Sequence, residues 1–287
     1  MLSQDMLIAL YERIKASRGI LGYAQVSILC DELELDVEAL MIELLPVAAK
    51  FALPPISKFY VGAIALERTS ANSGNLYFGA NLEFSDQALG LVVHAEQSAI
   101  NNAWLNGAKQ IDLIAITDAP CGHCRQFMNE MHNADALSIN LPHKRTSLRR
   151  LLPEDFGPKD LDNHESLFQS TKQALSFSMT ISDALCETVC RSYAPYTGNY
   201  CAVELETNKG RFVGGYIENA AYNPSLSPLQ SALSQIQMSG YKLEEISITN
   251  ITLVEQEGKK NQLGVVKAVI SSLGYEIAIK EVTAYGL

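Results

Sequence analysis

Apolar residues recur every three or four positions over the first 50 residues, in runs such as MLIALYERI and VEALMIELLPVAAKFAL. This spacing predicts amphipathic helices. The period then changes, because KFYVGAIAL (58–66) and LYFGANLEF (76–84) alternate in part between apolar and polar positions. The turn-forming segment ERTSANSGN lies between them, so we expect a β-hairpin over residues 58–84.

Helical and strand-like patterns alternate after the hairpin. They predict helix, strand, helix and strand over residues 96–107, 110–117, 124–132 and 136–142. The order of hairpin, helix, strand, helix and strand predicts an α/β fold with a three-layer α/β/α core and some parallel strand pairing.

The second half of the chain repeats this order. GANLEF of the first half matches GGYIEN of the second, and HAEQSAI matches SPLQSAL. The match predicts an internal duplication, with a linker rich in proline and charge between the copies. The second copy has Ser227 and Leu229 where the first has His94 and Glu96, and it contains no PCxxC. We therefore expect only the first copy to carry chemistry.

Length, charge and cysteine content narrow the class of protein. A chain of 287 residues fits about two domains. The net charge of -10 disfavours a nucleic-acid partner and suits a small neutral or cationic substrate. No apolar run of 18 residues occurs, and the acidic N-terminal turns do not resemble a signal peptide, so we expect no membrane association. Six cysteines without an export signal predict a reducing, cytoplasmic location.

The stretch PCGHC at residues 120–124 allows three kinds of chemistry. A redox dithiol stands at the start of a helix after a strand, as this pair is predicted to do. A structural zinc site needs four protein ligands, and no second CxxC is present. A catalytic zinc site needs three ligands and one open position.

His94 can supply the third ligand. It lies 27 residues before Cys121, separated from it by one predicted helix and one predicted strand. That crossover length brings two helix N-termini to one edge of a sheet. Zinc held by one imidazole and two thiolates would activate a water, and Glu96 could carry that water's proton. His123, inside the motif, is expected not to be a ligand.

The pattern H-x-E…P-C-x-x-C is the established signature of zinc-dependent nucleoside and nucleobase deaminases. Here it reads His94-Ala95-Glu96 and Pro120-Cys121-Gly122-His123-Cys124. The chain also resembles the long, two-domain bacterial and plant form of cytidine deaminase over about residues 45–240. The resemblance rests on GANLEF, HAEQSAINNAWL, PCGHCRQFMNE, INLP, FGPKDL and ENAAYNP.

The resemblance implies hydrolytic deamination of cytidine and deoxycytidine to uridine and deoxyuridine, with release of ammonia, in pyrimidine salvage. It implies one Zn²⁺ per subunit on His94, Cys121 and Cys124, a zinc-bound hydroxide as nucleophile, and Glu96 as proton shuttle. Further contacts are implied for Asn81 and Glu83 with the ribose 3′-hydroxyl, Phe59 stacked on the pyrimidine, the backbone of Ala95 with the base O2, and the carbonyl of Ala119 with the 4-amino group.

The resemblance also implies a homodimer in which Phe156, in FGPKDL, reaches the active site of the neighbouring subunit. We expect an N-terminal helical segment over 1–45, a catalytic zinc domain over 46–150, a linker over 151–180 and a degenerate, non-catalytic domain over 181–287.

Three other functions remain open at this point. A deaminase of polynucleotides shares the zinc motif, although the acidic charge and GANLEF argue against it. The other two are a zinc-binding protein without turnover and a CxxC dithiol oxidoreductase.

Overall fold

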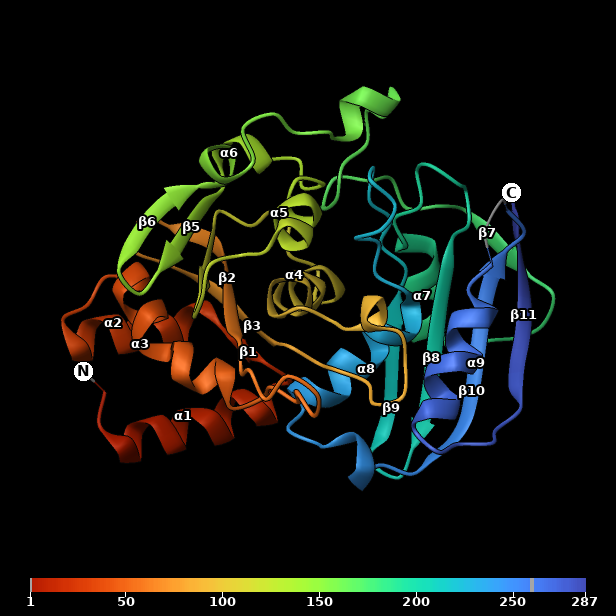
Figure 1. The fold of residues 1–287 in the computed structure, drawn as a ribbon, viewed down its shortest axis with the longest axis horizontal. Helices are drawn as coiled ribbons and strands as arrows, with labels where there is room; N and C mark the ends of the chain where they lie inside the picture. The colour runs from red at the N-terminus through yellow and green to blue at the C-terminus, as the bar shows by residue number, and fades with distance from the viewer. Residues whose placement is uncertain (1, 259–260) are drawn as a thin grey trace.

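The alternating apolar segments build two β-sheets, one in each half of the chain, in a computed structural model that describes residues 2–258 and 261–287 (Figure 1). The first half contains α1 (Gln4–Ala16), β1 (Ile20–Leu21), α2 (Tyr23–Leu33), α3 (Val37–Ala49), β2 (Gly62–Ser70), β3 (Ser73–Ala80), α4 (Ala95–Leu105), β4 (Leu113–Ile116), α5 (Gly122–Met128), β5 (Ser138–Leu141), β6 (Lys144–Ser147) and α6 (Leu148–Leu151). The second half contains β7 (Leu175–Phe177), α7 (Asp183–Arg191), β8 (Cys201–Thr207), β9 (Gly210–Gly215), α8 (Pro228–Met238), β10 (Ile248–Gln256), α9 (Leu263–Ser272) and β11 (Ile279–Gly286).

The two sheets share the order of four of their strands, which confirms the predicted duplication. The first runs β1-β3-β2-β4-β5-β6 and the second β7-β11-β10-β8-β9. The segment β3-β2-β4-β5 therefore corresponds to β9-β8-β10-β11. Both segments begin with an antiparallel hairpin, continue with an antiparallel pair and end with a parallel pair.

The period-two pattern of β2 separates two cores, as expected for a strand covered on both faces. Ile64 and Leu66 pack in one buried cluster with α1, α2 and α3, whereas Ala63 and Ala65 pack in another with α4 and α5. In the second half, Leu185 and Val189 of α7 cover one face of the sheet in a separate buried cluster. Helices α8 and α9 cover the other face. Each half is therefore an α/β/α layering, as predicted.

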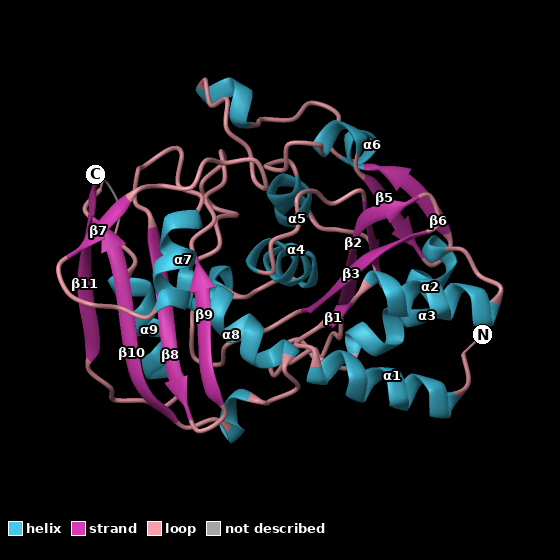
Figure 2. Ribbon diagram, turned by 180° about the vertical axis from the view of Figure 1, so that it is seen from behind, coloured by secondary structure: helices cyan, strands magenta, loops and turns pink. Residues whose placement is uncertain are grey.

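Helices α4 and α8 lie between the two sheets, and the N- and C-terminal elements lie at opposite ends of the molecule (Figures 1 and 2). Each helix approaches a glycine of its own sheet closely. A Cβ atom on Gly79 would lie 2.1 Å from the backbone nitrogen of Ala99, and one on Gly214 would lie 2.2 Å from that of Ala232. Only glycine fits these two positions without a shift of the backbone.

Hydrogen bonds across the boundary between the halves repeat in pairs. Gln97 Nε2 donates to the carbonyl of Pro224 at 2.9 Å, and Gln230 Nε2 donates to the carbonyl of Leu91 at 2.6 Å. The helices and loops involved occupy matched positions in the two copies. The halves therefore pack with approximate twofold symmetry along α4 and α8.

The predicted elements are present, with shifted ends. The hairpin is confirmed, but its first strand begins at Gly62 and not at residue 58. Residues 67–70 and 73–75, expected as a loop, extend the strands toward a tight turn. The pattern did not predict β1, β6 or β7. Strand β1 lies inside the expected N-terminal helical segment and pairs with β3, and β7 lies inside the expected linker and pairs with β11.

The longest helices of the described residues, α1 and α3, have 13 residues each. None of the described helices is long and apolar enough to cross a membrane.

Candidate metal centre

Two helix N-termini meet at one end of the first sheet. His94 is the residue that precedes α4, and Cys121 is the residue that precedes α5, directly after β4 and its exit loop. Cys124 lies in the first turn of α5. The crossover from α4 through β4 to α5 therefore brings together three side chains that are up to 30 positions apart.

The three side chains are spaced as ligands of one ion. Cys121 Sγ lies 3.6 Å from His94 Nδ1 and 3.6 Å from Cys124 Sγ, and the three ligand atoms all lie within 4.8 Å of one another. Zn–S bonds of about 2.3 Å and Zn–N bonds of about 2.0 Å, in a tetrahedron, separate ligand atoms by about 3.5–3.8 Å. The sequence-based expectation that His94 joins the PCxxC pair is confirmed.

The donor set also fits a cation electrostatically. Hydrogen bonding with Cys124 and His94 lowers the pKa of Cys121 to about 3. The hydrogen bond to Cys121 and burial raise the pKa of Cys124. The pKa values of the two adjacent thiols are thus pushed apart, because two thiolates at this distance repel each other. A divalent cation between them removes that repulsion and allows both to ionise.

His123 packs beside the site without entering the ligand set. Its ring stacks on the His94 ring with centroids 4.7 Å apart and planes inclined by 22°. Burial and the neighbouring His94 lower the pKa of His123. A neutral ring stacked in this way restricts the orientation of the ligand imidazole, as neighbours of metal-bound histidines commonly do.

Glu96 lies in the first turn of α4 and is 4% exposed. Cys124 Sγ donates to Glu96 Oε2 at 3.2 Å, so the carboxyl group adjoins the metal ligands. Burial raises the pKa of Glu96, against hydrogen bonds and the charge of His94 that lower it. A buried carboxyl group beside an open coordination position is placed to exchange protons with a bound water.

The metal ligands and Glu96 line a cleft of about 310 Å³. Most of the substrate-binding residues implied by the sequence line this same cleft: Phe59, Asn81, Glu83, Ala95 and Ala119. They come from the loop before β2, the loop after β3, the start of α4 and the loop after β4. Sequence reasoning did not identify the remaining lining residues, which are Ser57, Val61, Val92, Val93 and Asp118.

Two polar side chains at the cleft wall are held in fixed orientations. Asn81 Oδ1 accepts from the backbone N–H of Val61 at 2.9 Å, and its Nδ2 donates to the carbonyl of Phe59 at 2.9 Å. Glu83 Oε2 accepts from the backbone N–H groups of Ile56 and Ser57 at 3.0 and 2.9 Å. An amide N–H of Asn81 and a lone pair of Glu83 remain for a ligand.

Phe156 is not among the described residues that line this cleft. Its side chain is 46% exposed, while its carbonyl accepts from Gln126 Nε2 at 2.7 Å and from Asn129 Nδ2 at 3.1 Å. Its backbone is therefore fixed to α5 and the residues directly after it, although its ring projects into solvent.

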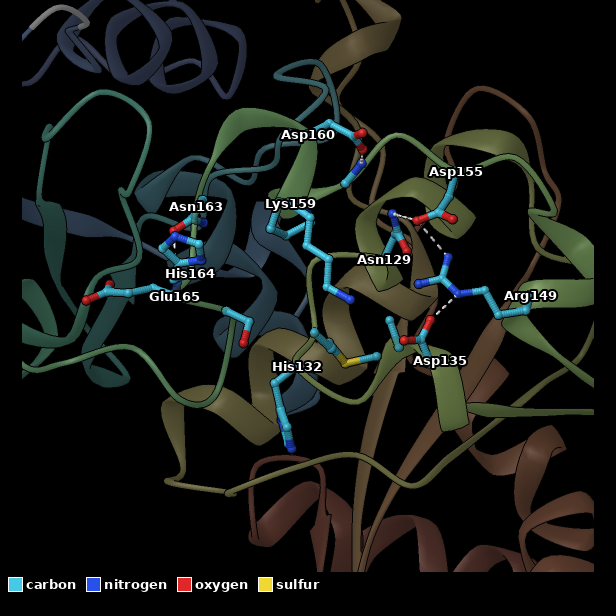
Figure 3. A pocket seen from close by; sticks show the side chains of 15 residues that line it. Asn129, His132, Asp135, Arg149, Asp155, Lys159, Asp160, Asn163, His164 and Glu165 are labelled. Carbon is cyan, nitrogen blue, oxygen red and sulfur yellow. Dashed lines mark hydrogen bonds and ion pairs between the residues drawn. The ribbon is translucent and has the colours of Figure 1, made fainter.

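A separate polar cavity of about 440 Å³ lies beneath the linker (Figure 3). Asp155 bridges Asn129 and Arg149 there, at 2.9 and 2.8 Å, and Arg149 also pairs with Asp135 at 2.5 Å. These bonds anchor the linker next to Phe156.

The matched position in the second half is built differently. Ser227 precedes α8 and accepts from the backbone N–H of Gln230 at 3.3 Å, as an ordinary helix cap. Leu229 takes the place of Glu96 and is fully buried. Among the described residues, the metal-ligand set therefore lies in the first half.

Comparison with known proteins agrees with this geometry. Two family models, both described as the cytidine and deoxycytidylate deaminase zinc-binding region, match residues 36–138 and 148–266. Cytidine deaminase of Aliivibrio fischeri is 41% identical over 268 residues, covering 92% of this chain and 88% of that protein. Cytidine deaminase of Shewanella sediminis is 46% identical over 251 residues, covering 85% of this chain and 82% of that protein. Among solved structures, cytidine deaminase from Mycobacterium tuberculosis is 30% identical and covers 42% of this chain and 96% of that chain, with a TM-score of 0.37.

Proposed function

We propose that this chain, which belongs to the cytidine deaminase family, hydrolyses cytidine and deoxycytidine to uridine and deoxyuridine with release of ammonia. The observation that carries the proposal is the contact of Glu96 with a three-residue ligand set that lines a cleft. Zinc bound there would lower the pKa of a water in its open position to about 7.

The residues of the chain account for proton transfer. Glu96 takes a proton from the water and delivers it to ring N3 while the water oxygen bonds to C4, so that C4 becomes tetrahedral. Glu96 then takes the remaining proton from the new C4 hydroxyl and passes it to the 4-amino group. The bond between C4 and that nitrogen breaks, the C4–O double bond forms, and ammonia leaves. Glu96 returns to its starting state, so a single carboxyl group serves as base and as acid.

The walls of the cleft supply groups that fit a nucleoside. We assign Asn81 and Glu83 to the ribose 3′-hydroxyl, because each keeps one free hydrogen-bonding position there. Phe59, whose side chain is 56% exposed, presents a ring for stacking on the base. The N–H of Ala95, in the first turn of α4, has no acceptor within the helix and is assigned to the base O2. The carbonyl of Ala119 is assigned to the 4-amino group.

We further propose that the chain forms a homodimer and that Phe156 completes the cleft of the neighbouring subunit. Its exposed ring and its fixed backbone support this role. The turn beside the cleft also presents an apolar rim, because Ile56, Phe59 and Tyr60 are 48%, 56% and 56% exposed. A partner subunit would cover this rim.

We propose a cytoplasmic location. All six cysteines, each within the described part of the chain, are free thiols, which suits a reducing compartment.

Incubation of the purified protein with cytidine tests the main proposal, with uridine and ammonia measured as products. For each cytidine consumed, one uridine and one ammonia are expected to appear. A single-stranded oligonucleotide containing cytosine serves as the competing substrate, since an editor of polynucleotides shares the zinc motif. Deamination of the oligonucleotide but not of free cytidine would refute the proposal.

A further inference from the structure

The turn that leads into the cleft has a counterpart in the second half. Leu53 forms a bridge with Leu82 on one side of Glu83, and Tyr193 forms the same bridge with Ile217 on one side of Glu218. The turns 53–59 and 193–199 therefore occupy equivalent positions, and their residues can be matched one by one.

In the first half, Ser57 connects a carboxylate of the cleft wall to the backbone of Phe59. Ser57 Oγ donates to Glu83 Oε1 at 2.5 Å and accepts from the backbone N–H of Phe59 at 3.1 Å. Glu83 Oε2 also accepts from Ile56 and Ser57, as described above. One hydroxyl thus joins the residue assigned to ribose and the residue assigned to base stacking.

The second half contains the same set of bonds. Thr197 Oγ1 donates to Glu218 Oε1, and it accepts from the backbone N–H of Asn199 at 3.2 Å. Glu218 Oε2 accepts from the backbone N–H groups of Tyr196 and Thr197 at 2.9 and 3.2 Å. This half has Ser227 and Leu229 in place of the metal ligand and the proton carrier, so the bonds persist without the chemistry. These hydrogen bonds therefore fix the shape of the turn.

The residue whose backbone N–H bonds to the hydroxyl differs between the halves. Phe59 is exposed at the cleft, whereas Asn199 is fully buried and donates to Glu255 Oε1 at 2.9 Å. Asn81 of the cleft wall is likewise replaced by a buried tyrosine, Tyr216. The same turn therefore presents a side chain to a cleft in one half and to the protein interior in the other.

The first-half turn depends more strongly on its hydrogen bonds. The residue after the hydroxyl has a left-handed backbone in both halves, at φ 56° for Lys58 and 70° for Gly198. Glycine adopts this conformation freely, whereas lysine does not. Contacts around Lys58 must hold it in that conformation, and those of Ser57 are adjacent.

We propose that Ser57 is a positioning residue for the reaction, which orients Glu83 toward the ribose and the ring of Phe59 toward the base. The proposal rests on the proposed function. Loss of the hydroxyl removes one of the three bonds to Glu83 and leaves the N–H of Phe59 without its acceptor. Substrate binding should suffer more than the chemical step, because His94, Cys121, Cys124 and Glu96 are untouched.

Steady-state kinetics of three variants test this role. S57V and S57A are expected to raise KM for cytidine roughly tenfold, with a smaller change in kcat. S57T is expected to restore wild-type kinetics, because threonine makes the same bonds at position 197. S57V and S57T have nearly the same shape and differ in the hydroxyl, so their difference reports the hydrogen bonds. S57A gives the same readout without added bulk, should S57V fold poorly.

Two further measurements separate positioning from general structure. The increase in KM of S57V should be smaller with 3′-deoxycytidine, which lacks the hydroxyl that Glu83 is assigned to bind. T197V removes the matched hydroxyl of the second half, which does not line the cleft, and should leave the kinetics of folded, zinc-loaded enzyme unchanged.

Wild-type kinetics in S57V, failure of S57T to restore them, or an equal loss in T197V would overturn the role of Ser57 alone. Absence of cytidine turnover in the wild type would overturn the proposed function and the role of Ser57 with it.

Discussion

Ser98 Oγ of α4 and Ser234 Oγ of α8 lie 2.8 Å apart at the boundary between the two halves, and both side chains are fully buried. Each buried hydroxyl is hydrogen-bonded to the other and no longer to water. The pair therefore links the catalytic half to the half that lacks the metal ligands. Removal of one partner leaves the other buried without its bond, which is costlier than removal of both.

A double-mutant cycle measures this coupling. S98A and S234A are each expected to lower the free energy of unfolding by about 1 kcal/mol or more, and the double variant by less than the sum. Chemical denaturation of the four proteins provides the values. If the changes in unfolding free energy of the two single variants simply added up in the double variant, the direct bond would be contradicted. S239A serves as the control, because it removes a hydroxyl that bonds within its own helix turn.

A second buried group links the halves and responds to pH. Glu130, after α5, accepts from the hydroxyl groups of Tyr193 and Tyr196 and from the N–H of Ala220. Burial raises the pKa of Glu130, although these hydrogen bonds lower it in part. The folded state therefore favours the protonated carboxyl group relative to the unfolded state.

This shift predicts the sign of a pH effect. The contribution of Glu130 to stability is fully present below its unfolded pKa, about 4.3. It is lost as the pH rises through the raised pKa of the folded state. E130Q should flatten the dependence of unfolding free energy on pH above that value, as measured by denaturation at several pH values. E244Q, at an exposed position, serves as the control and should leave the slope of unfolding free energy against pH unchanged. If E130Q also left that slope unchanged, the pKa of Glu130 would not differ between the folded and unfolded states.

Metal removal should expose one particular thiol. Cys121 is exposed, whereas Cys124 is 1% exposed. After treatment with a chelator, Cys121 is expected to react with an alkylating reagent, and added zinc should protect it because the thiolate is then coordinated. Mass spectrometry of the labelled peptides identifies the site. Cys186, partly exposed and distant in sequence, should label equally in both states; zinc-independent labelling of Cys121 would argue against its role as a ligand.

The proposed dimer predicts complementation between two defective subunits. F156A should lower kcat/KM roughly tenfold or more, as the loss of an aromatic contact at an interface does. A mixture of F156A and E96Q chains, unfolded and refolded together, should form mixed dimers. In each mixed dimer, the intact cleft of the F156A chain receives Phe156 of the E96Q chain.

The expected recovery follows from counting sites. Random assembly makes half of the dimers mixed, and one site of two is complete in each, so about a quarter of wild-type activity should return. The two variants kept apart supply the baseline. If the activity of the refolded mixture did not exceed that baseline, Phe156 would not complete the cleft of the neighbouring subunit.

The sequence was sufficient for the features that depend on local pattern and on motif spacing. The helical periodicity of 96–107 matches α4, and the distance from His94 to Cys121 is filled by one helix and one strand, as expected. The correspondence of GANLEF with GGYIEN is also found in the structure, where Gly79 and Gly214 occupy equivalent close contacts.

Features that depend on contacts between residues far apart in the sequence could not be predicted from local patterns. Residues 58–61 look like strand, but the bonds of Ser57 to Glu83, 26 positions away, turn the chain before β2 begins. Ser57 was missed for the same reason, although PIS before KFYVGA resembles PYT before GNYCAV. The strands β6 and β7 were missed because the first is an edge strand of mostly polar residues and the second, also at an edge, has only three half-buried residues.

The proposed mechanism requires that Glu96 act beside a three-ligand zinc ion without binding it. Zinc content and ammonia release from cytidine, measured on the same preparations of wild type and E96Q, test this directly. We expect about one zinc per chain in both proteins, and turnover in E96Q lower by a factor of roughly a hundred or more. E96Q that retains turnover, or that loses its zinc together with its activity, would contradict the mechanism.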